Sequence, residues 1–223
     1  DGRAGNICVA NPWPGMMQTI YGDPDRFIET YFGKYAKKDS KDWRDWPYVT
    51  GDGGTKSPDG YLRVVGRVDD VINVAGHRLG TKELESAALT VNEISEAAAV
   101  PAYDELKGRV PEMYVSLKPG YESGVEIENK VKQAINEIIG PIARPTHVWV
   151  TSDLPKTRSG KIMRRVIASI SNFIDVGDTT TLANPEVVDE IRKEVQSAKV
   201  KLGKVPQVVS KEVEEELSKF GEE

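Results

Sequence analysis

A run of basic residues is the segment of this sequence best suited to binding a phosphate. Residues 151–165 hold five Lys or Arg and one acid, a local charge of +4 in a protein with net charge −5. We expect Ser159 to cap a helix after this loop, and a helix N-terminus with nearby cations can bind an anion. A solvated basic loop is the alternative. The segment is not a P-loop, because Pro155 and Ile162 stand where that motif requires Gly and Ser or Thr.

Two further segments combine charge with glycine. Residues 66–80 contain two Arg, two Asp and three Gly, and glycine lets a backbone approach a ligand closely. A tight loop with surface ion pairs would use the same residues. Asp52 lies in a Gly-rich stretch that we expect to be a turn. A carboxylate there can accept both hydroxyl protons of a ribose diol, although it can equally cap the turn.

The elements that must position these segments are short, and they favour an α/β (α+β) fold. Residues 1–67 are β-rich and irregular, with strands expected at 7–9 and 61–65, and they look too short to bury a core of their own. Apolar spacing predicts three helices in the middle of the chain, beginning at Thr81, near Ile127 and at Ser159. Strands are expected at 113–117 and 147–150, and 97–100 is a short apolar run.

The last segment begins near Asp175. Residues 185–200 place Val187, Val188, Ile191 and Val195 on one side of a predicted helix. Charge dominates from Lys199 onward, and we expect a solvated helix or a frayed end there.

Taken together and in order, the three segments resemble the late motifs of the adenylate-forming superfamily of acyl-CoA synthetases. These motifs are a T-G-D turn, a G-R-x-D-D stretch that continues to G-x-R and E-x-E (here Glu83 and Glu85), and a P-K-T-x-S-G-K loop. The resemblance runs from about Asn6 to Pro185. Three stretches narrow it to the AMP-forming acetyl-CoA synthetases, namely residues 74–81, 139–143 and 177–185.

The resemblance implies an incomplete enzyme. Residues 1–68 correspond to the edge of a large N-terminal adenylation domain, 69–174 to the small C-terminal domain, with a few-stranded sheet flanked by helices, and 175–223 to a helical, charged tail. The phosphate loop, adenine pocket and acyl pocket of full-length members are missing. We therefore expect a fragment or a truncated product, inactive alone, whose principal partner is the missing domain.

The implied reaction joins acetate to coenzyme A. Acetate attacks ATP, with Mg²⁺, to give acetyl-AMP and pyrophosphate, and CoA then displaces AMP. By resemblance Lys161 is the catalytic lysine of the first step and Asp69 is the hinge of a domain swing between the two steps. The remaining roles are ATP or AMP binding by Asp52, Arg67 and Arg78, and CoA binding by Ala75 and Gly76.

Several further positions bear on CoA binding, cation binding and regulation. Asn136 replaces an Arg that contacts CoA in related bacterial enzymes, with Lys132 one turn earlier as a substitute. A cation can bind carbonyl oxygens after the helix at 81–91 in related structures, here those of Leu89, Val91 and Ile94. We expect His77 to be a structural loop residue. Lys161 is a candidate for acetylation as an off-switch, which would require an acetyltransferase and a deacetylase as partners.

Composition excludes several classes of function. One cysteine, Cys8, and two histidines allow neither an intrachain disulfide nor a Cys/His zinc site, and we expect a cytoplasmic protein. No long apolar run predicts a membrane span, and the net acidity argues against nucleic acid. Two alternatives stay open: the same chemistry on propionate or 3-hydroxypropionate, and a stand-alone, non-catalytic module.

Overall fold

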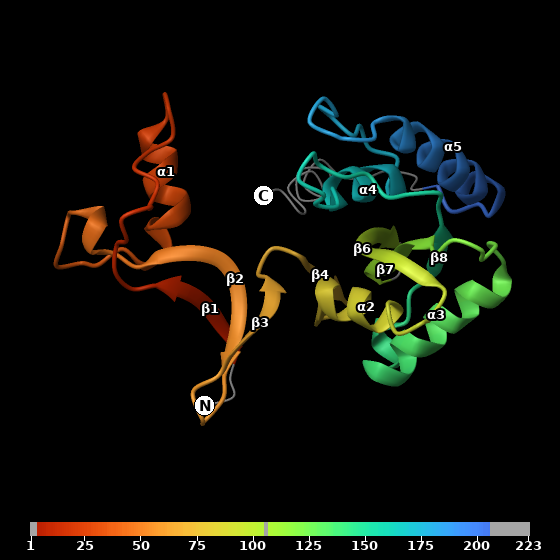
Figure 1. Cartoon of the computed structure of the whole chain (residues 1–223), viewed down its shortest axis with the longest axis horizontal. Helices are drawn as coiled ribbons and strands as arrows, with labels where there is room; N and C mark the ends of the chain where they lie inside the picture. Colours follow the sequence, from red (N-terminus) through yellow and green to blue (C-terminus); the bar gives the residue numbers. More distant parts are fainter. Residues whose placement is uncertain (1–3, 105–106, 206–223) are drawn as a thin grey trace. The chain divides into compact units, whose positions relative to one another are not determined.

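The computed structural model describes residues 4–104 and 107–205 and divides the chain into two units between Val68 and Asp69 (Figure 1). The fold is a mixture of helices and small sheets, as the sequence predicts. Within the described residues no helix is long and apolar enough to cross a membrane.

The first unit contains a three-stranded antiparallel sheet in the order β1-β2-β3. Its strands are β1 (Ala4–Val9), β2 (Tyr48–Lys56) and β3 (Leu62–Arg67). Between β1 and β2 lie α1 (Pro24–Tyr31) and the short 3-10 helices η1 (Gly33–Tyr35) and η2 (Trp43–Asp45). Asp52 lies inside β2, so the expectation of a turn at this glycine-rich stretch is wrong.

An aromatic cluster stabilises the first unit. Phe27 and Phe32 are each only 1% exposed, and the ring of Tyr31 stacks on that of Tyr48 with centroids 5.4 Å apart. The Asp23 carboxylate accepts the backbone N–H of Arg26 at 3.1 Å and so caps α1. The expectation that this part of the chain buries no core is therefore wrong for the aromatic segment.

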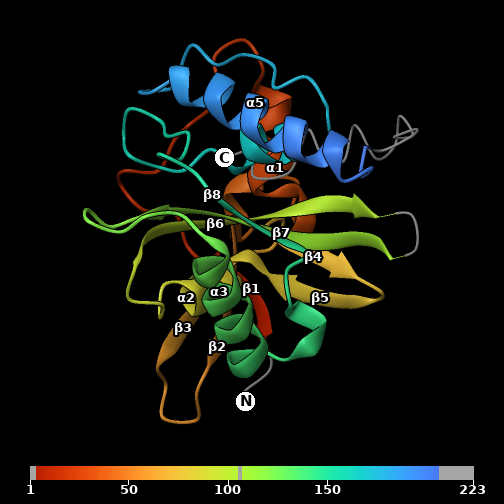
Figure 2. The ribbon, with the colours of Figure 1, turned by 90° about the vertical axis from the view of Figure 1, so that its right-hand side faces the viewer.

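The second unit has a three-stranded sheet covered on both faces. Its strands are ordered β6-β7-β8, with β6 and β7 antiparallel and β7 and β8 parallel. Helices α2 and α3 lie on one face, and α4 and α5 on the other (Figures 1 and 2). The strands are β6 (Ile94–Asp104), β7 (Gly108–Leu117) and β8 (His147–Val150); the helices are α2 (Thr81–Ala88), α3 (Val125–Ile138), η3 (Pro141–Ala143), α4 (Arg164–Ser171) and α5 (Glu186–Lys201).

Burial on both faces explains the sequence of the central strands. Residues 97–100, Ala-Ala-Ala-Val, are all buried, because small side chains let helices approach both sides of β6. On β7 the opposite run Met113, Tyr114 and Val115 is fully buried. A separate two-stranded hairpin, β4 (Val71–Val74) and β5 (His77–Gly80), precedes α2.

Two helix starts differ from the prediction. The N-cap of α2 is Gly80, and Thr81 is its first residue, with a buried side chain. Helix α4 begins at Arg164 with Met163 as N-cap, so Ser159 caps no helix. The chain between Ser159 and Met163 instead completes a hydrogen-bonded loop, described below. Because α4 begins after Lys161, the expected helix N-terminus for an anion lies three residues beyond this lysine.

Candidate functional site

Asp52 and Arg67 are cross-strand partners at the end of the β2–β3 ladder. A Cβ atom placed on Gly51, whose φ is +80°, would lie 2.9 Å from Nη1 of Arg67, so the guanidinium lies directly over this glycine. Burial raises the pKa of the nearby Tyr48 hydroxyl; the neighbouring Tyr31 and the charge of Asp52 raise it further, and the charge of Arg67 opposes the shift. The end of the β2–β3 ladder therefore presents a carboxylate and a guanidinium on paired residues.

The β4–β5 hairpin presents Ala75 and Gly76 at its tip. Both residues have positive φ values, 48° and 86°, as a two-residue turn of type I′ requires. A Cβ on Gly76 would meet nothing within 4 Å, so the space beside it is open and only the backbone conformation opposes a side chain. His77 and Arg78 follow on β5 with exposed side chains.

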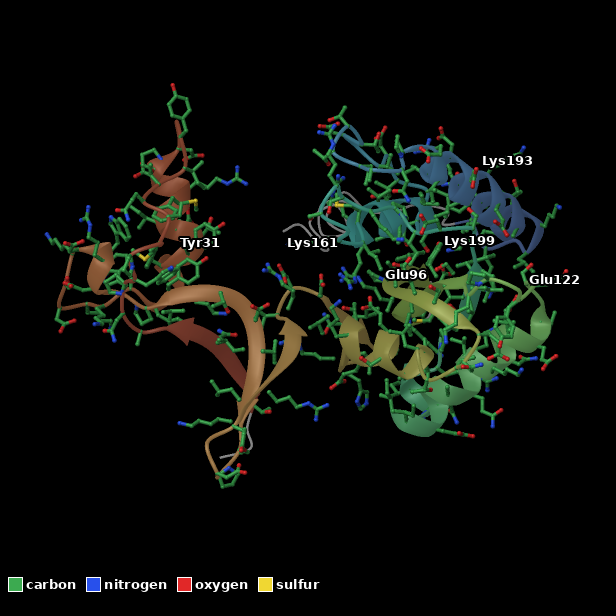
Figure 3. All side chains as sticks on the ribbon, in the orientation of Figure 1. Tyr31, Glu96, Glu122, Lys161, Lys193 and Lys199 are labelled. Atoms are coloured by element: carbon green, nitrogen blue, oxygen red, sulfur yellow. The ribbon has the colours of Figure 1, made fainter. Side chains whose placement is uncertain are left out.

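Lys161 is exposed and lies at the end of a tight loop of five residues (Figure 3). The Thr157 N–H donates to the Lys161 carbonyl at 2.8 Å, the Gly160 N–H donates to the Thr157 carbonyl at 2.9 Å, and the Lys161 N–H donates to Oγ1 of Thr157 at 3.1 Å. Gly160 has a φ of +82°, which closes the turn. The loop thus has a defined backbone conformation even though its tip faces solvent.

The segment before α5 holds this loop from the side. Asn184 accepts the Lys156 N–H through Oδ1 at 2.9 Å, and its Nδ2 donates to Oδ2 of Asp153 and to the Leu154 carbonyl, each at 2.9 Å. Thr157 forms a β-bridge with Leu182. Sequence reasoning missed Asn184, although it noted the surrounding residues 177–185, because an amide that bridges distant backbone groups has no local signature.

Most cations of the basic run have partners inside the second unit. Lys156 pairs with Glu96 at 2.6 Å and with Asp153 at 2.7 Å, and Arg165 donates to the Val176 carbonyl at 2.7 Å. Arg164 is buried. Arg158 and Lys161 are the two exposed cations of the run. The local charge of +4 is therefore not a uniform phosphate-binding surface, and its solvent-facing part is concentrated in the loop around Lys161.

The remaining predicted positions are scattered over the second unit. Asp69 is exposed and is its first residue. Asn136 lies half-buried near the end of α3, and the Lys132 ammonium is 3.7 Å from the Glu128 carboxylate. At the proposed cation site, after α2, the Val91 carbonyl already accepts the Ile94 N–H at 3.1 Å. Within the described residues no group of three or more His, Cys, Asp or Glu could hold a metal ion.

A family model matches the central part of the second unit. The family model described as AMP-binding enzyme C-terminal domain matches residues 83–161, from the α2 glutamates to the exposed lysine. Residues 83–161 are thus similar to AMP-binding enzyme C-terminal domains. Both the hydrogen-bonded loop of Lys161 and the sheet β6-β7-β8 fall within the matched residues.

The chain also matches curated relatives along most of its length. It is 46% identical over 196 residues to the acetyl-coenzyme A synthetase of Rubrobacter xylanophilus, a match covering 87% of this chain and 29% of the relative. The acetyl-coenzyme A synthetase of Rhizobium meliloti is 47% identical over 194 residues, covering 86% and 28%. The resemblance to this family is thus confirmed, and the chain spans less than a third of the length of these relatives.

Solved structures support the fold. The acetoacetyl-CoA synthetase from Streptomyces lividans matches 88% of this chain and 29% of its own, with a TM-score of 0.67 and 21% identity. An anthranilate CoA ligase in complex with anthranoyl-AMP matches 76% and 30%, with a TM-score of 0.58 and 22% identity. At these identities the likeness concerns the fold alone.

Proposed function

We propose that this chain is part of an AMP-forming acetate–CoA ligase, to which it contributes the lysine of the adenylation step and the hairpin of the thioester step. The observation that carries the proposal is the exposed Lys161 on a tightly hydrogen-bonded loop, in a chain 46–47% identical to acetyl-coenzyme A synthetases. The large adenylation domain, with the pocket for the acid, would be its principal partner.

In the first step an acetate oxygen attacks the α-phosphorus of ATP, and pyrophosphate leaves with the electrons of the broken P–O bond. Acetate is a weak nucleophile that approaches a polyanion, so a cation at the α-phosphate stabilises the charge of the transition state. Lys161 would supply that cation. Mg²⁺ would enter with ATP and neutralise its phosphates, since the described residues offer no cluster of acidic ligands.

The first unit would hold the rest of the nucleotide. Asp52 would accept hydrogen bonds from the two ribose hydroxyls, and Arg67, its cross-strand partner, would reach the ribose or the phosphates. Arg78 would add a second guanidinium from the hairpin of the second unit.

In the second step the CoA sulfur attacks the acyl carbon of acetyl-AMP, and AMP leaves as the acyl–O bond breaks. The open space beside Gly76 would admit the pantetheine arm along the backbone of Ala75 and Gly76. A rotation about Asp69 would exchange Lys161 for this hairpin at the active site. Acetylation of Lys161 by a protein acetyltransferase would remove its charge and stop the first step, and a deacetylase would restore it.

The decisive experiment separates the two steps in the enzyme that contains this chain and the adenylation domain. Lys161→Ala is expected to lower acetate-dependent ATP–pyrophosphate exchange by about 10²–10³-fold. Lys193→Ala is the matched control, because Lys193 is an exposed lysine on α5 (Figure 3) and should leave exchange unchanged. Full exchange activity in Lys161→Ala would overturn the proposal. Exchange with propionate or 3-hydroxypropionate in place of acetate tests the alternative acids.

Gly76→Leu tests the hairpin. It is expected to spare pyrophosphate exchange and to block thioester formation from acetyl-AMP and CoA, because its side chain would occupy the open space at the turn. Gly120→Leu is the matched control: Gly120 has a φ of +90° and likewise nothing within 4 Å of its Cβ position, so the strain is similar at a distant turn. Equal loss of both steps in Gly76→Leu would contradict the assignment.

A further inference from the structure

Arg164, three residues after Lys161, is buried and forms a two-pronged ion pair with Glu85 of α2. Its Nε donates to Oε1 at 2.7 Å and its Nη2 donates to Oε2 at 2.8 Å. Only arginine presents this planar pair of donors to a carboxylate, and the geometry fixes orientation as well as distance. The end of the Lys161 loop is therefore anchored to a helix far away in the sequence.

The same guanidinium also reaches the beginning of the second unit. Its Nη1 lies 3.6 Å from Oδ2 of Asp70, which is 4% exposed and adjacent to Asp69. Oε1 of Glu85 accepts the backbone N–H of Ala99 on β6 at 3.2 Å. The Arg164 cluster, defined as Arg164, Glu85 and Asp70, thus joins the start of α4 to α2, to the central strand and to the residue beside the proposed hinge.

Stability alone does not explain such a cluster. Removing three charges from water costs several kcal/mol per ion, and replacement of buried ion pairs by apolar side chains is often neutral or stabilising. Leu84, Ala88 and Ile167 belong to the hydrophobic core of this unit, which apolar replacements of the cluster would extend. What the ion pairs add is a fixed relative position of the elements that they connect.

We propose that Arg164 is a positioning residue for Lys161. The Arg164 cluster holds the end of the lysine loop at a fixed distance from Asp70, so that a rotation about Asp69 carries Lys161 to the α-phosphate as part of a rigid body. The inference rests on the proposed function, because it takes the roles of Lys161 and Asp69 from there. It adds that the Arg164 cluster determines the position of Lys161 at the α-phosphate after the rotation.

The Gly76 hairpin is stabilised by strand pairing and by core residues outside the Arg164 cluster. Its four cross-strand residue pairs, from Val71 with Gly80 to Val74 with His77, define its shape without a side chain of the Arg164 cluster. Ile72, Val74 and Leu79 also anchor it in the hydrophobic core. Loosening the cluster should therefore displace the lysine loop more than the hairpin, and the two half-reactions should respond unequally.

The test is Arg164→Lys in the enzyme that contains this chain and the adenylation domain. Lysine keeps the charge but cannot form the two-pronged pair. We expect kcat for acetate-dependent pyrophosphate exchange to fall by about 10–10²-fold, the size of effect that a displacement of about 1 Å produces. KM for ATP and the rate of thioester formation from acetyl-AMP should each change by less than about threefold. Arg192→Lys, which alters an exposed 3.8 Å pair with Asp189, is the control.

A second measurement does not depend on activity. In the 223-residue chain, Arg164→Lys and Glu85→Gln should speed hydrogen exchange at the Gly160 and Lys161 amides, and leave the β4–β5 amides as protected as before. If both half-reactions fall by the same factor, or exchange accelerates over the whole unit, Arg164 is merely structural and the inference is wrong. If Lys161→Ala spares adenylation, the proposed function fails first. Adenylation that depends on Lys161 but not on Arg164 refutes only this inference.

Discussion

Lys161 and Lys199 belong to the same unit and have opposite environments (Figure 3). Lys161 faces solvent at the end of a loop, whereas Lys199, on α5, is only 4% exposed. The Lys199 ammonium donates to Oε2 of Glu112 at 2.8 Å, to the Ser171 carbonyl at 2.7 Å and to the Ser171 hydroxyl at 3.0 Å. All three N–H donors of Lys199 are used inside the protein. Lysine therefore attaches a helix at position 199 and presents a charge to solvent at position 161.

The contacts of Lys199 attach α5 to the sheet. Oε2 of Glu112, on β7, also accepts the Trp149 indole N–H at 3.1 Å and the Ser171 hydroxyl. Burial lowers the pKa of the Lys199 ammonium, and the Glu112 carboxylate opposes that shift. The expectation of a solvated chain from Lys199 onward is therefore wrong at Lys199 itself. Residues 206–223, on which the rest of that expectation falls, lie outside the described residues.

The largest expected effect is the loss of stability when the buried ion pair between Lys199 and Glu112 is removed. Lys199→Met should lower the free energy of unfolding by about 3–5 kcal/mol, because it leaves the Glu112 carboxylate buried without its cation. Urea denaturation of the 223-residue chain measures the change. The double variant Glu112→Gln/Lys199→Met should recover much of the loss, since it removes both charges. A single variant as stable as the original chain would show that the pair contributes nothing to the attachment of α5.

Amine labelling measures the difference in exposure between Lys161 and Lys199 directly. Acetic anhydride should modify Lys161 at a rate close to that of exposed Lys193, whereas Lys199 should react at least about 10²-fold more slowly, because it must first detach from Glu112 and Ser171 by local unfolding. Mass spectrometry of timed digests gives the three rates. Rapid modification of Lys199 in the folded chain would mean that α5 opens easily.

The smallest effect concerns pH. His147 stacks on Trp149 with ring centroids 5.1 Å apart and lies 3.0 Å from the Lys204 ammonium. Burial lowers the pKa of its imidazole from the usual 6.5; Glu112 opposes this, and Lys204, Lys199 and Lys132 reinforce it.

The His147 imidazole therefore binds more protons near pH 6.5 in the unfolded chain than in the folded chain. Stability should fall as pH falls through this region, by less than about 1.4 kcal/mol per pH unit. His147→Gln should flatten the dependence of the unfolding midpoint between pH 7.5 and 5.5. An unchanged slope in that variant would exclude His147 as its source.

Local patterns account for what the sequence predicted well. The predicted strand at 147–150 has the bounds of β8, and the predicted helix that ends before Gly140 is α3. Periodicity and a terminating glycine act within one element, so one sequence shows them. The loop of Lys161 was identified by its residues, but Ser159 as a helix cap was wrong, because the Thr157 hydroxyl and backbone bind Lys161 and Ser159 instead.

Contacts between distant segments account for what the sequence did not show. Whether a basic residue is exposed depends on acids elsewhere: Lys156 pairs with Glu96, Arg164 with Glu85, and Lys199 with Glu112. None of these partners follows from spacing along the chain. The same holds for Asp52, whose glycine-rich surroundings suggest a turn until β1 and β3 are seen on either side of it.

The hydrogen bonds between Asn184 and the segment before Lys161 also have a consequence for synthesis on the ribosome. The contacts that Asn184 makes with Asp153, Leu154 and Lys156 join the loop to residues made well after Lys161. A nascent chain that has just exposed Lys161 lacks these contacts, and they form only after residue 184 has left the exit tunnel. The loop thus reaches its final shape only after 23 further residues have followed Lys161 out of the tunnel.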